Sequence, residues 1–182
     1  TTKIITDEEP GKGKLDKIKG LQPVFEKDGT ITAANASSIN DGAAALTITS
    51  NQKVQELNIS PICRIVSQAS VANEPLYFTT APSKAITKVL QKSGLSIEDI
   101  DLFEINEAFS NVVLATMKEH SIHHEKVNIY GGAVSLGHPI GASGARILVT
   151  LISALRKNKK KIGLATLCIG GGEAAAIIVE II

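Results

Sequence analysis

The sequence of 182 residues contains no tryptophan, two tyrosines and four phenylalanines. Proteins that bind single-stranded nucleic acid stack the bases on aromatic side chains along a strongly basic groove. A formal net charge of +1 is too small to indicate a strongly basic groove. We therefore expect no nucleic-acid partner for this chain.

Cysteine and long apolar runs are also scarce. The two cysteines, Cys63 and Cys168, are too few for a disulfide framework, and their spacing predicts no metal site. Such cysteine usage fits a reducing compartment. No apolar run is long enough to span a membrane, so we expect no membrane partner. Because the chain begins at Thr1 and not at Met, we expect that this is not its natural start.

Small residues are abundant by contrast, and the stretch 131–146 holds five glycines. A glycine-rich loop that leads into a helix offers backbone N–H groups to an anion. The helix is expected over the apolar run 147–155, with Ser143 or Ser135 as its cap. His138 lies between a glycine and a proline, and a histidine held in such a loop suggests acid–base chemistry.

A second small-residue stretch spans 31–46, where Asn40 and Asp41 can cap a helix that begins at Gly42. Two interpretations stay open. The stretch is either a tightly packed alanine helix after a turn, or a ligand-binding loop followed by a buried helix.

From residue 31 onwards, expected strands alternate with expected helices, which predicts an α/β fold with a mixed five-stranded sheet. Helices are expected at 51–58, 83–92, 147–155 and after Asn106. Strands are expected at 62–71, 100–105 (half-buried), 127–130, 162–168 and 174–182. The histidines at 120, 123 and 124 predict a solvated helix end and no metal site.

Three polar residues stand at turns that follow expected strands: Asn106, His138 and Cys168. Small residues follow each of them and leave room for a substrate. Asn106 has the simpler alternative of capping the next helix. Because the ends of strands in one sheet can meet, we expect the three side chains to surround one cavity.

The motifs around these residues resemble a known family. Asn106-Glu107-Ala108-Phe109, Gly137-His138-Pro139 and Cys168-Ile169-Gly170-Gly171-Gly172 are similar to the three C-terminal active-site motifs of the thiolases. Thr32 to Ala45 resembles the family's coenzyme A loop and the following helix. The resemblance implies a thiolase-like layered α/β fold. It assigns residues 1–39 to the end of the coenzyme A-binding loop region, 40–60 to the last elements of the N-terminal domain and 61–182 to the C-terminal domain.

The resemblance also implies an activity. Thiolases of the acetyl-CoA C-acetyltransferase type condense two acetyl-CoA molecules reversibly to acetoacetyl-CoA and coenzyme A. The family's nucleophilic cysteine lies in its N-terminal half, and neither Cys63 nor Cys168 stands in that context. The chain alone is therefore expected to be inactive, with acyl-CoA, coenzyme A, the missing N-terminal half and further copies in a dimer or tetramer as its partners.

The family's residue roles carry over by motif. Cys168 would be the base that removes a proton beside the thioester carbonyl, and His138 would activate the nucleophile and donate to the enolate oxygen. Asn106 would hold a water in the same oxyanion hole, and the N–H of Gly170 would serve a second hole. The implied substrate- or coenzyme A-binding residues are Ser37, Phe78, Ala108 and Phe109. Of these, Ser37 would contact coenzyme A, and Phe78 and Phe109 would be walls of the acyl pocket.

Two details are similar to the mitochondrial, potassium-responsive acetoacetyl-CoA thiolases, namely Val134-Ser135-Leu136 and Ala81-Pro82. This resemblance implies no organic cofactor and a mitochondrial location, with the cytoplasm as the alternative. It implies a potassium site made of backbone carbonyls, which suit a hard cation. The residues concerned are Ala33, Ala34, Ala36 and Val134.

One departure from the family pattern stands beside the expected base. Glu173 follows the glycines where an uncharged residue is usual, and a nearby carboxylate would raise the pKa of the Cys168 thiol. A non-catalytic thiolase-like scaffold or lipid carrier therefore stays an alternative. Cys168 argues against a β-ketoacyl synthase. The absence of a Gly-Lys-Ser/Thr ending argues against a phosphate-binding loop.

Overall fold

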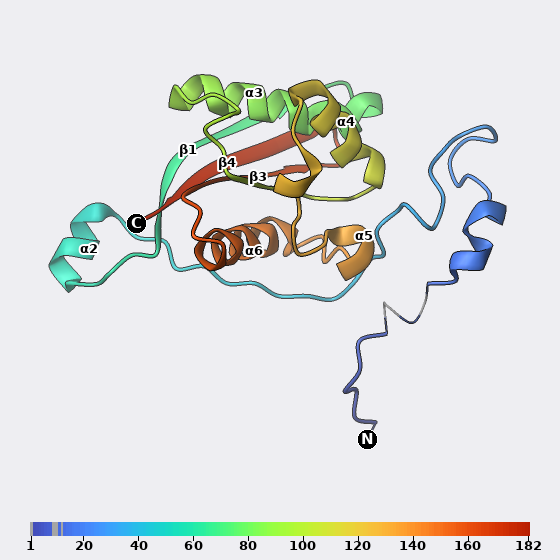
Figure 1. Cartoon of the computed structure of the whole chain (residues 1–182), viewed down its shortest axis with the longest axis horizontal. Helices are drawn as coiled ribbons and strands as arrows, with labels where there is room; N and C mark the ends of the chain where they lie inside the picture. The colour runs from blue at the N-terminus through green and yellow to red at the C-terminus, as the bar shows by residue number, and fades with distance from the viewer. Residues whose placement is uncertain (1, 9–10, 12) are drawn as a thin grey trace.

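The computed structural model describes residues 2–8, 11 and 13–182, and it places one sheet between two layers of helices (Figure 1). One layer holds α3 (Ala81–Ser93) and α4 (Ser110–His120), and the other holds α5 (Ala133–Leu136) and α6 (Ser143–Lys157). The strand order is β1 (Cys63–Ala72), β4 (Glu173–Ile181), β3 (Ile162–Cys168) and β2 (Leu102–Ile105). The pair β2–β3 is parallel, whereas β4 runs antiparallel to β1 and β3. The α/β fold with a mixed sheet is confirmed.

The sheet has four strands among the described residues, so the prediction of five is wrong. The missing strand is the one expected at 127–130, which makes a single bridge between Val127 and Phe103. Asn128 has a left-handed backbone, and its side-chain amide bonds both the N–H and the C=O of Ile105 at 2.9 Å. A side chain therefore satisfies the edge of β2 where a fifth strand was expected.

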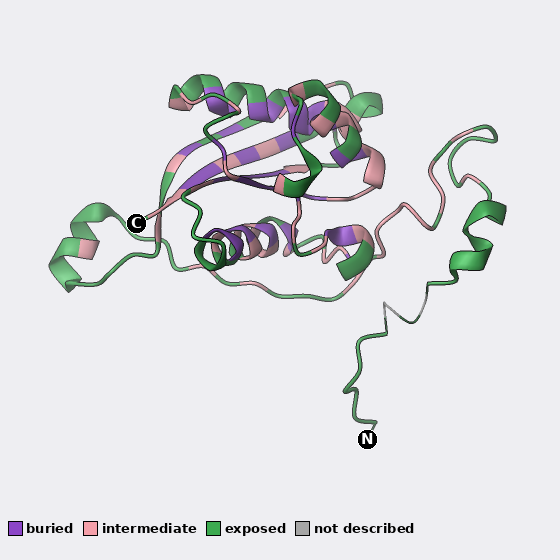
Figure 2. Ribbon diagram, viewed as in Figure 1, coloured by how far each residue is buried: buried purple, intermediate pink, exposed green. Residues whose placement is uncertain are grey.

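Buried apolar residues form a cluster on each face of the sheet. Figure 2 shows buried residues in the strands and in the helices of both layers. The expected helix at 83–92 is α3, which buries Ile86 and Val89 and ends at Gly94 in the left-handed conformation that favours glycine. On the other face, a Cβ at Gly163 would lie 2.8 Å from the Cδ1 atoms of Leu151 and Leu155. Glycine at this position lets α6 pack closely against β3.

β2 differs from the half-buried strand expected at 100–105, because all four of its residues are buried. Helices cover both faces of this part of the sheet, and a strand covered on both faces has no solvent side. Glu104, in the middle of β2, is therefore a buried carboxyl with 2% exposure.

The helix expected from Gly42 is absent, so the helical part of both interpretations of the stretch 31–46 is wrong, and the ligand-binding loop stays a prediction. Residues 41–50 form an extended, mostly exposed segment that runs below α6 to α2 (Asn51–Leu57) (Figure 1). Gly42 lies against the Pro139 ring, where a Cβ at position 42 would be 2.6 Å from the Pro139 Cβ. The helix predicted at 51–58 is confirmed as α2, and Ser50 caps it by accepting from the N–H of Lys53.

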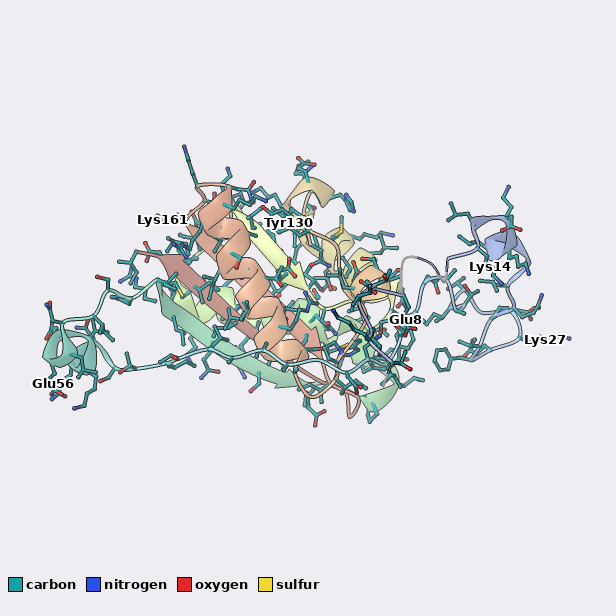
Figure 3. The ribbon with its side chains drawn as sticks, turned by 90° about the horizontal axis from the view of Figure 1, so that it is seen from below. Glu8, Lys14, Lys27, Glu56, Tyr130 and Lys161 are labelled. Atoms are coloured by element: carbon teal, nitrogen blue, oxygen red, sulfur yellow. The ribbon has the colours of Figure 1, made fainter. Side chains whose placement is uncertain are left out.

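The remaining helical elements are short 3₁₀ turns: η1 (Leu15–Gly20), η2 (Pro75–Thr80) and η3 (His124–Lys126). Figure 3 shows Lys14 and Lys27 at one end of the molecule and Glu56 at the other, all away from the sheet. Within the described residues, no helix combines the length and apolarity that a bilayer crossing demands. No cluster of three His, Cys, Asp or Glu side chains suited to a metal ion is found there either.

Candidate active site

The structure brings two of the expected site residues into contact. Asn106 directly follows β2, is 1% exposed and donates its backbone N–H to the carbonyl of Thr166 at 2.9 Å. Its side-chain Nδ2 lies 3.3 Å from Nε2 of His138 in the loop between α5 and α6. The alternative that Asn106 caps a helix is wrong, because α4 begins at Ser110 with Phe109 in the capping position.

The other ring nitrogen of His138 is held by Ser143. Nδ1 lies 2.5 Å from the Ser143 Oγ, and that hydroxyl donates its proton to the carbonyl of Pro139 at 3.0 Å. Because a serine hydroxyl carries one proton, Ser143 accepts from Nδ1–H, and Nε2 of the neutral ring is left without a proton. The expectation that Ser143 caps the helix is wrong, since it lies inside α6 and its side chain serves the histidine.

The environment keeps this imidazole neutral. Burial and, next in size, the positive charge of Arg146 lower the pKa of His138 below its usual value. A neutral ring with a bare Nε2 that faces the Asn106 amide can take a proton from a neighbouring acid. The geometry therefore supports the expected acid–base role of His138.

A loop from the N-terminal stretch lies against these residues. Ser37 donates its backbone N–H and its hydroxyl to the carbonyl of Ala108, at 3.1 and 3.0 Å. Ser38 accepts from the N–H of His138 at 2.9 Å, and a Cβ at Gly137 would collide with the side-chain amide of Asn40. Segment 37–40 thus forms one wall of the site.

Cys168 ends β3, next to the strand that leads to Asn106. Ile105 is level with Thr166, so Asn106 is level with Leu167 and Cys168 lies one residue further on. The two backbones are then about 5 Å apart across the sheet and offset by about 3 Å along it. The thiol therefore lies at the same edge as the amide and the imidazole.

Burial raises the pKa of the Cys168 thiol above its usual value. Glu173 is exposed and is not a cause of this shift, and its carboxylate lies over Gly171. Gly170 lies exposed in the same turn, with open space where a Cβ would stand. The turn itself is closed by Gly172, whose positive φ of 100° suits glycine.

Phe78 and Phe109 line a cavity of about 550 Å³. Their ring centroids are 6.2 Å apart in an edge-to-face arrangement, and the ring of Phe25 lies 5.5 Å from that of Phe109. The Phe25 ring is a third aromatic wall of this cavity, which no local sequence pattern indicates.

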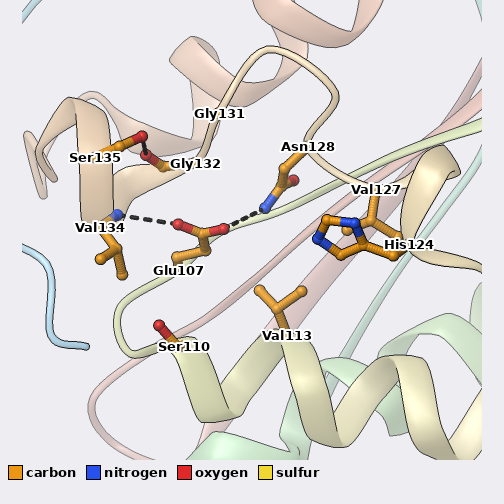
Figure 4. A pocket seen from close by; sticks show the side chains of 10 residues that line it. All are labelled: Glu107, Ser110, Val113, His124, Val127, Asn128, Gly131, Gly132, Val134 and Ser135. Carbon is orange, nitrogen blue, oxygen red and sulfur yellow. Dashed lines mark hydrogen bonds between the residues drawn. The ribbon is translucent and has the colours of Figure 1, made fainter. Parts of the chain in front are cut away.

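A second cavity, of about 360 Å³, lies on the other side of Glu107 (Figure 4). The Glu107 carboxylate accepts from the N–H of Val134 at 3.0 Å and from the amide of Asn128 at 3.1 Å. It therefore joins the start of α5 to the turn that follows β2. This positions the loop that carries His138.

Comparison with known families decides the assignment. The model described as "Thiolase, C-terminal domain" matches residues 59–181, and "Thiolase, N-terminal domain" matches residues 2–52. The chain belongs to the thiolase family. The hydrogen-bonded pair of Asn106 and His138 lies within the matched C-terminal domain.

Similar thiolases extend well beyond the ends of this chain. It is 47% identical to a cytosolic acetyl-CoA acetyltransferase of Gibberella zeae, a match over 98% of this chain and 45% of that protein. A thiolase from Ascaris suum in complex with coenzyme A superposes with a TM-score of 0.88 at 47% identity, covering 98% of this chain and 47% of that one. Human mitochondrial 3-ketoacyl-CoA thiolase gives 0.85 at 39% identity over 93% of this chain and 43% of that one. The chain spans about half the length of the curated relatives it matches.

Two charged residues behind the thiolase site escaped the sequence reasoning. Glu104 on β2 and Arg146 on α6 form a buried pair, with 3.5 Å between Oε2 and Nη1. Burial outweighs the attraction of Arg146 and, with a smaller contribution from Glu107, raises the pKa of Glu104 to about 7. The sequence signal that could have identified Glu104 is a charged residue within an otherwise apolar strand.

The stability of the thiolase domain should depend on Glu104 near neutral pH. Since its pKa is about 7 in the folded state against 4.5 ordinarily, the folded state binds more protons between these values. Glu104 therefore makes its full contribution to the free energy of unfolding below pH 4.5. This contribution, at most about 3 kcal/mol, is lost as the pH rises through 7. Urea unfolding from pH 5 to 8 should show a stability decrease that Glu104→Gln removes. The exposed Glu119→Gln serves as control, and equal pH slopes in Glu104→Gln and the wild type would contradict this prediction.

Proposed function

We propose that this chain supplies the C-terminal part of the active site of an acetyl-CoA C-acetyltransferase. The observation that carries the proposal is the hydrogen-bonded chain from Asn106 through His138 to Ser143, at the sheet edge where β3 ends in Cys168. The names of the relatives and the coenzyme A complex of a similar thiolase support an acyl-CoA substrate. The three-part division at residues 39 and 60 stays a prediction.

The first half of the reaction uses His138. Its bare Nε2 takes the proton of a nucleophilic cysteine thiol from the N-terminal half, and the thiolate attacks acetyl-CoA and expels coenzyme A as a thiolate. The leaving thiolate takes the proton of the Cys168 thiol, so that coenzyme A departs as a thiol and Cys168 becomes a thiolate. An acetyl thioester with the enzyme remains. The resting tautomer set by Ser143 is the one that this step requires.

The second half uses Cys168. Its thiolate takes a proton from the methyl carbon of a second acetyl-CoA, and the resulting enolate carbon attacks the acetyl thioester and releases the nucleophilic cysteine. His138, now carrying the proton on Nε2, donates to the enolate oxygen, together with a water held by Asn106. Burial raises the pKa of Cys168, which makes its thiolate a stronger base once formed.

The direct test is thiolysis of acetoacetyl-CoA with free coenzyme A. The complete protein that contains this chain is expected to turn over, and the chain of 182 residues alone is not. Turnover by the chain alone would contradict the assignment of the nucleophile to the other half. Binding of acyl-CoA by the complete protein without turnover would favour the non-catalytic carrier.

Replacement of Ser143 tests the tautomer. Ser143→Ala removes the acceptor of the His138 Nδ1–H, so the proton can move to Nε2. A smaller fraction of the protein then has the unprotonated Nε2 that acts as the base. We expect kcat of the complete protein to fall by about tenfold. Ser153→Ala, on an exposed position of the same helix, is the matched control. An unchanged kcat in Ser143→Ala would show that the hydroxyl does not determine which nitrogen of the His138 ring carries the proton.

We further propose a potassium site made of backbone carbonyls. The donors are Ala33, Ala34, Ala36 and Val134. Both segments that carry them are tied to the same turn, through Ser110 N–H to the Asn35 carbonyl at 2.8 Å and Val134 N–H to Glu107 at 3.0 Å. Uncharged carbonyl oxygens suit an alkali cation. Activity of the complete protein should be higher in potassium than in sodium chloride, and equal activity counts against the site.

A mitochondrial location and assembly into a dimer or tetramer complete the proposal, with the cytoplasm as the alternative compartment. The names of similar proteins include both a cytosolic and a mitochondrial enzyme, so they support either compartment. Cell fractionation decides between the compartments, and sedimentation of the purified protein gives the number of copies.

A further inference from the structure

We propose that Glu104 and Arg146 are positioning residues for His138, which hold its ring neutral and in place while the site awaits substrate. The inference rests on the proposed function for its catalytic meaning. The arrangement that motivates it is a second layer of polar side chains directly behind the Asn106–His138–Ser143 contacts.

The two layers share the same two elements. Glu104 precedes Asn106 by two residues on the β2 segment, and alternation along an extended strand puts both on one face. Arg146 follows Ser143 by three residues on α6, and such residues neighbour each other on a helix surface. Two sets of contacts therefore connect β2 with α6. Asn106, His138 and Ser143 form the first, at the ends of these elements, and Glu104 with Arg146 forms the second, further into the fold.

The ion pair is costly to bury. Glu104 is 2% exposed, the Arg146 side chain is 19% exposed, and Arg146 Nε is buried without a partner among the described residues. Its Nη1 reaches Glu104 and the Thr150 hydroxyl only at 3.5 Å each. Replacement of such a pair by apolar side chains is often neutral or stabilising, so stability alone does not explain it.

Charge gives the pair its effect on His138. Arg146 opposes protonation of the ring and lowers the His138 pKa, and Glu104 lies beside the guanidinium. Glu107, beyond the end of β2, is the other charge that acts on Glu104. Because the pKa of Glu104 is about 7, its carboxyl is largely neutral where His138 titrates, so the charge that acts on His138 is that of Arg146. Loss of Arg146 should therefore raise the His138 pKa.

The test is a histidine NMR titration of the complete protein, with the His138 signal identified by its loss in His138→Gln. The double variant Glu104→Leu with Arg146→Met removes both charges and keeps an apolar pair. Its His138 pKa should rise, with Tm within about 4 °C of the wild type. Arg146→Lys keeps the charge and should leave the His138 pKa low. The signals of His120 and His123 should not move in any variant.

A second variant covers the case in which the double variant does not fold. Arg146→Gln removes only the charge of the guanidinium, keeps a polar side chain beside Glu104 and should also raise the His138 pKa. An unchanged His138 pKa in the folded double variant or in Arg146→Gln would overturn the inference.

Activity gives the catalytic readout. In the double variant, kcat for acetoacetyl-CoA thiolysis at neutral pH should fall by about tenfold, with a much smaller change in KM, and Arg146→Lys should restore most of it. An unaltered kcat in the folded double variant would also overturn the inference. A wild-type protein without turnover would instead refute the proposed function, and the NMR titration would still test the pair.

Discussion

Cys168→Ala is expected to lower kcat for condensation of acetyl-CoA by about 10³-fold or more in the complete protein, because it removes the group proposed as the base that forms the enolate. The thiol ends β3 beside Asn106, and alanine fits the space that it leaves. Acylation of the nucleophile does not need this base, so release of coenzyme A from a first acetyl-CoA should continue. Exchange of the acetyl methyl protons with deuterium from the solvent should stop.

Cys63→Ala is the matched control. Cys63 is also a half-buried thiol whose pKa burial raises, but it starts β1 instead of ending β3. Its replacement should leave both turnover and deuterium exchange unchanged. Persistent exchange in Cys168→Ala would assign the base to another residue.

His138→Ala should reduce activity by about 10⁴-fold, since the ring serves both halves of the reaction. In the proposed mechanism, the ring is first the base for the nucleophile and then the donor to the enolate oxygen. Both the release of coenzyme A on acylation and the deuterium exchange should therefore be lost, which distinguishes this variant from Cys168→Ala. Rapid-mixing measurements of coenzyme A release give the first step.

His123→Ala is the control for that experiment, because His123 is exposed beyond the end of α4. It should retain wild-type turnover. A normal acylation rate in His138→Ala would refute the role of the ring as the base for the nucleophile.

Short-range patterns predicted most elements of this thiolase chain correctly. The apolar period of α3 and the glycine that ends it depend on neighbours along the chain, as does the hairpin from β3 to β4. The predictions that failed needed distant partners. Where a helix was expected from Gly42, the chain is extended and lies against Pro139, and the Asn128 side chain takes the place of a fifth strand beside β2.

The site shows the same division. Motif resemblance singled out Asn106, His138 and Cys168 without any coordinates, because glycines and reactive side chains at these spacings are unusual. It assigned a capping role to Ser143, since a serine ahead of an apolar run is the ordinary cap. Only the fold shows that Ser143 bonds the histidine ring.

The order of residues was enough to predict the family and the layered α/β class and to select the candidate reactive groups, because each depends on local composition and spacing. The tertiary structure decided which polar groups meet, above all Glu104 with Arg146 and Asn106 with His138. The reason is electrostatic. The protonation of a buried side chain depends on its loss of water and on charges that lie near it in space, and neither can be read from its neighbours in sequence.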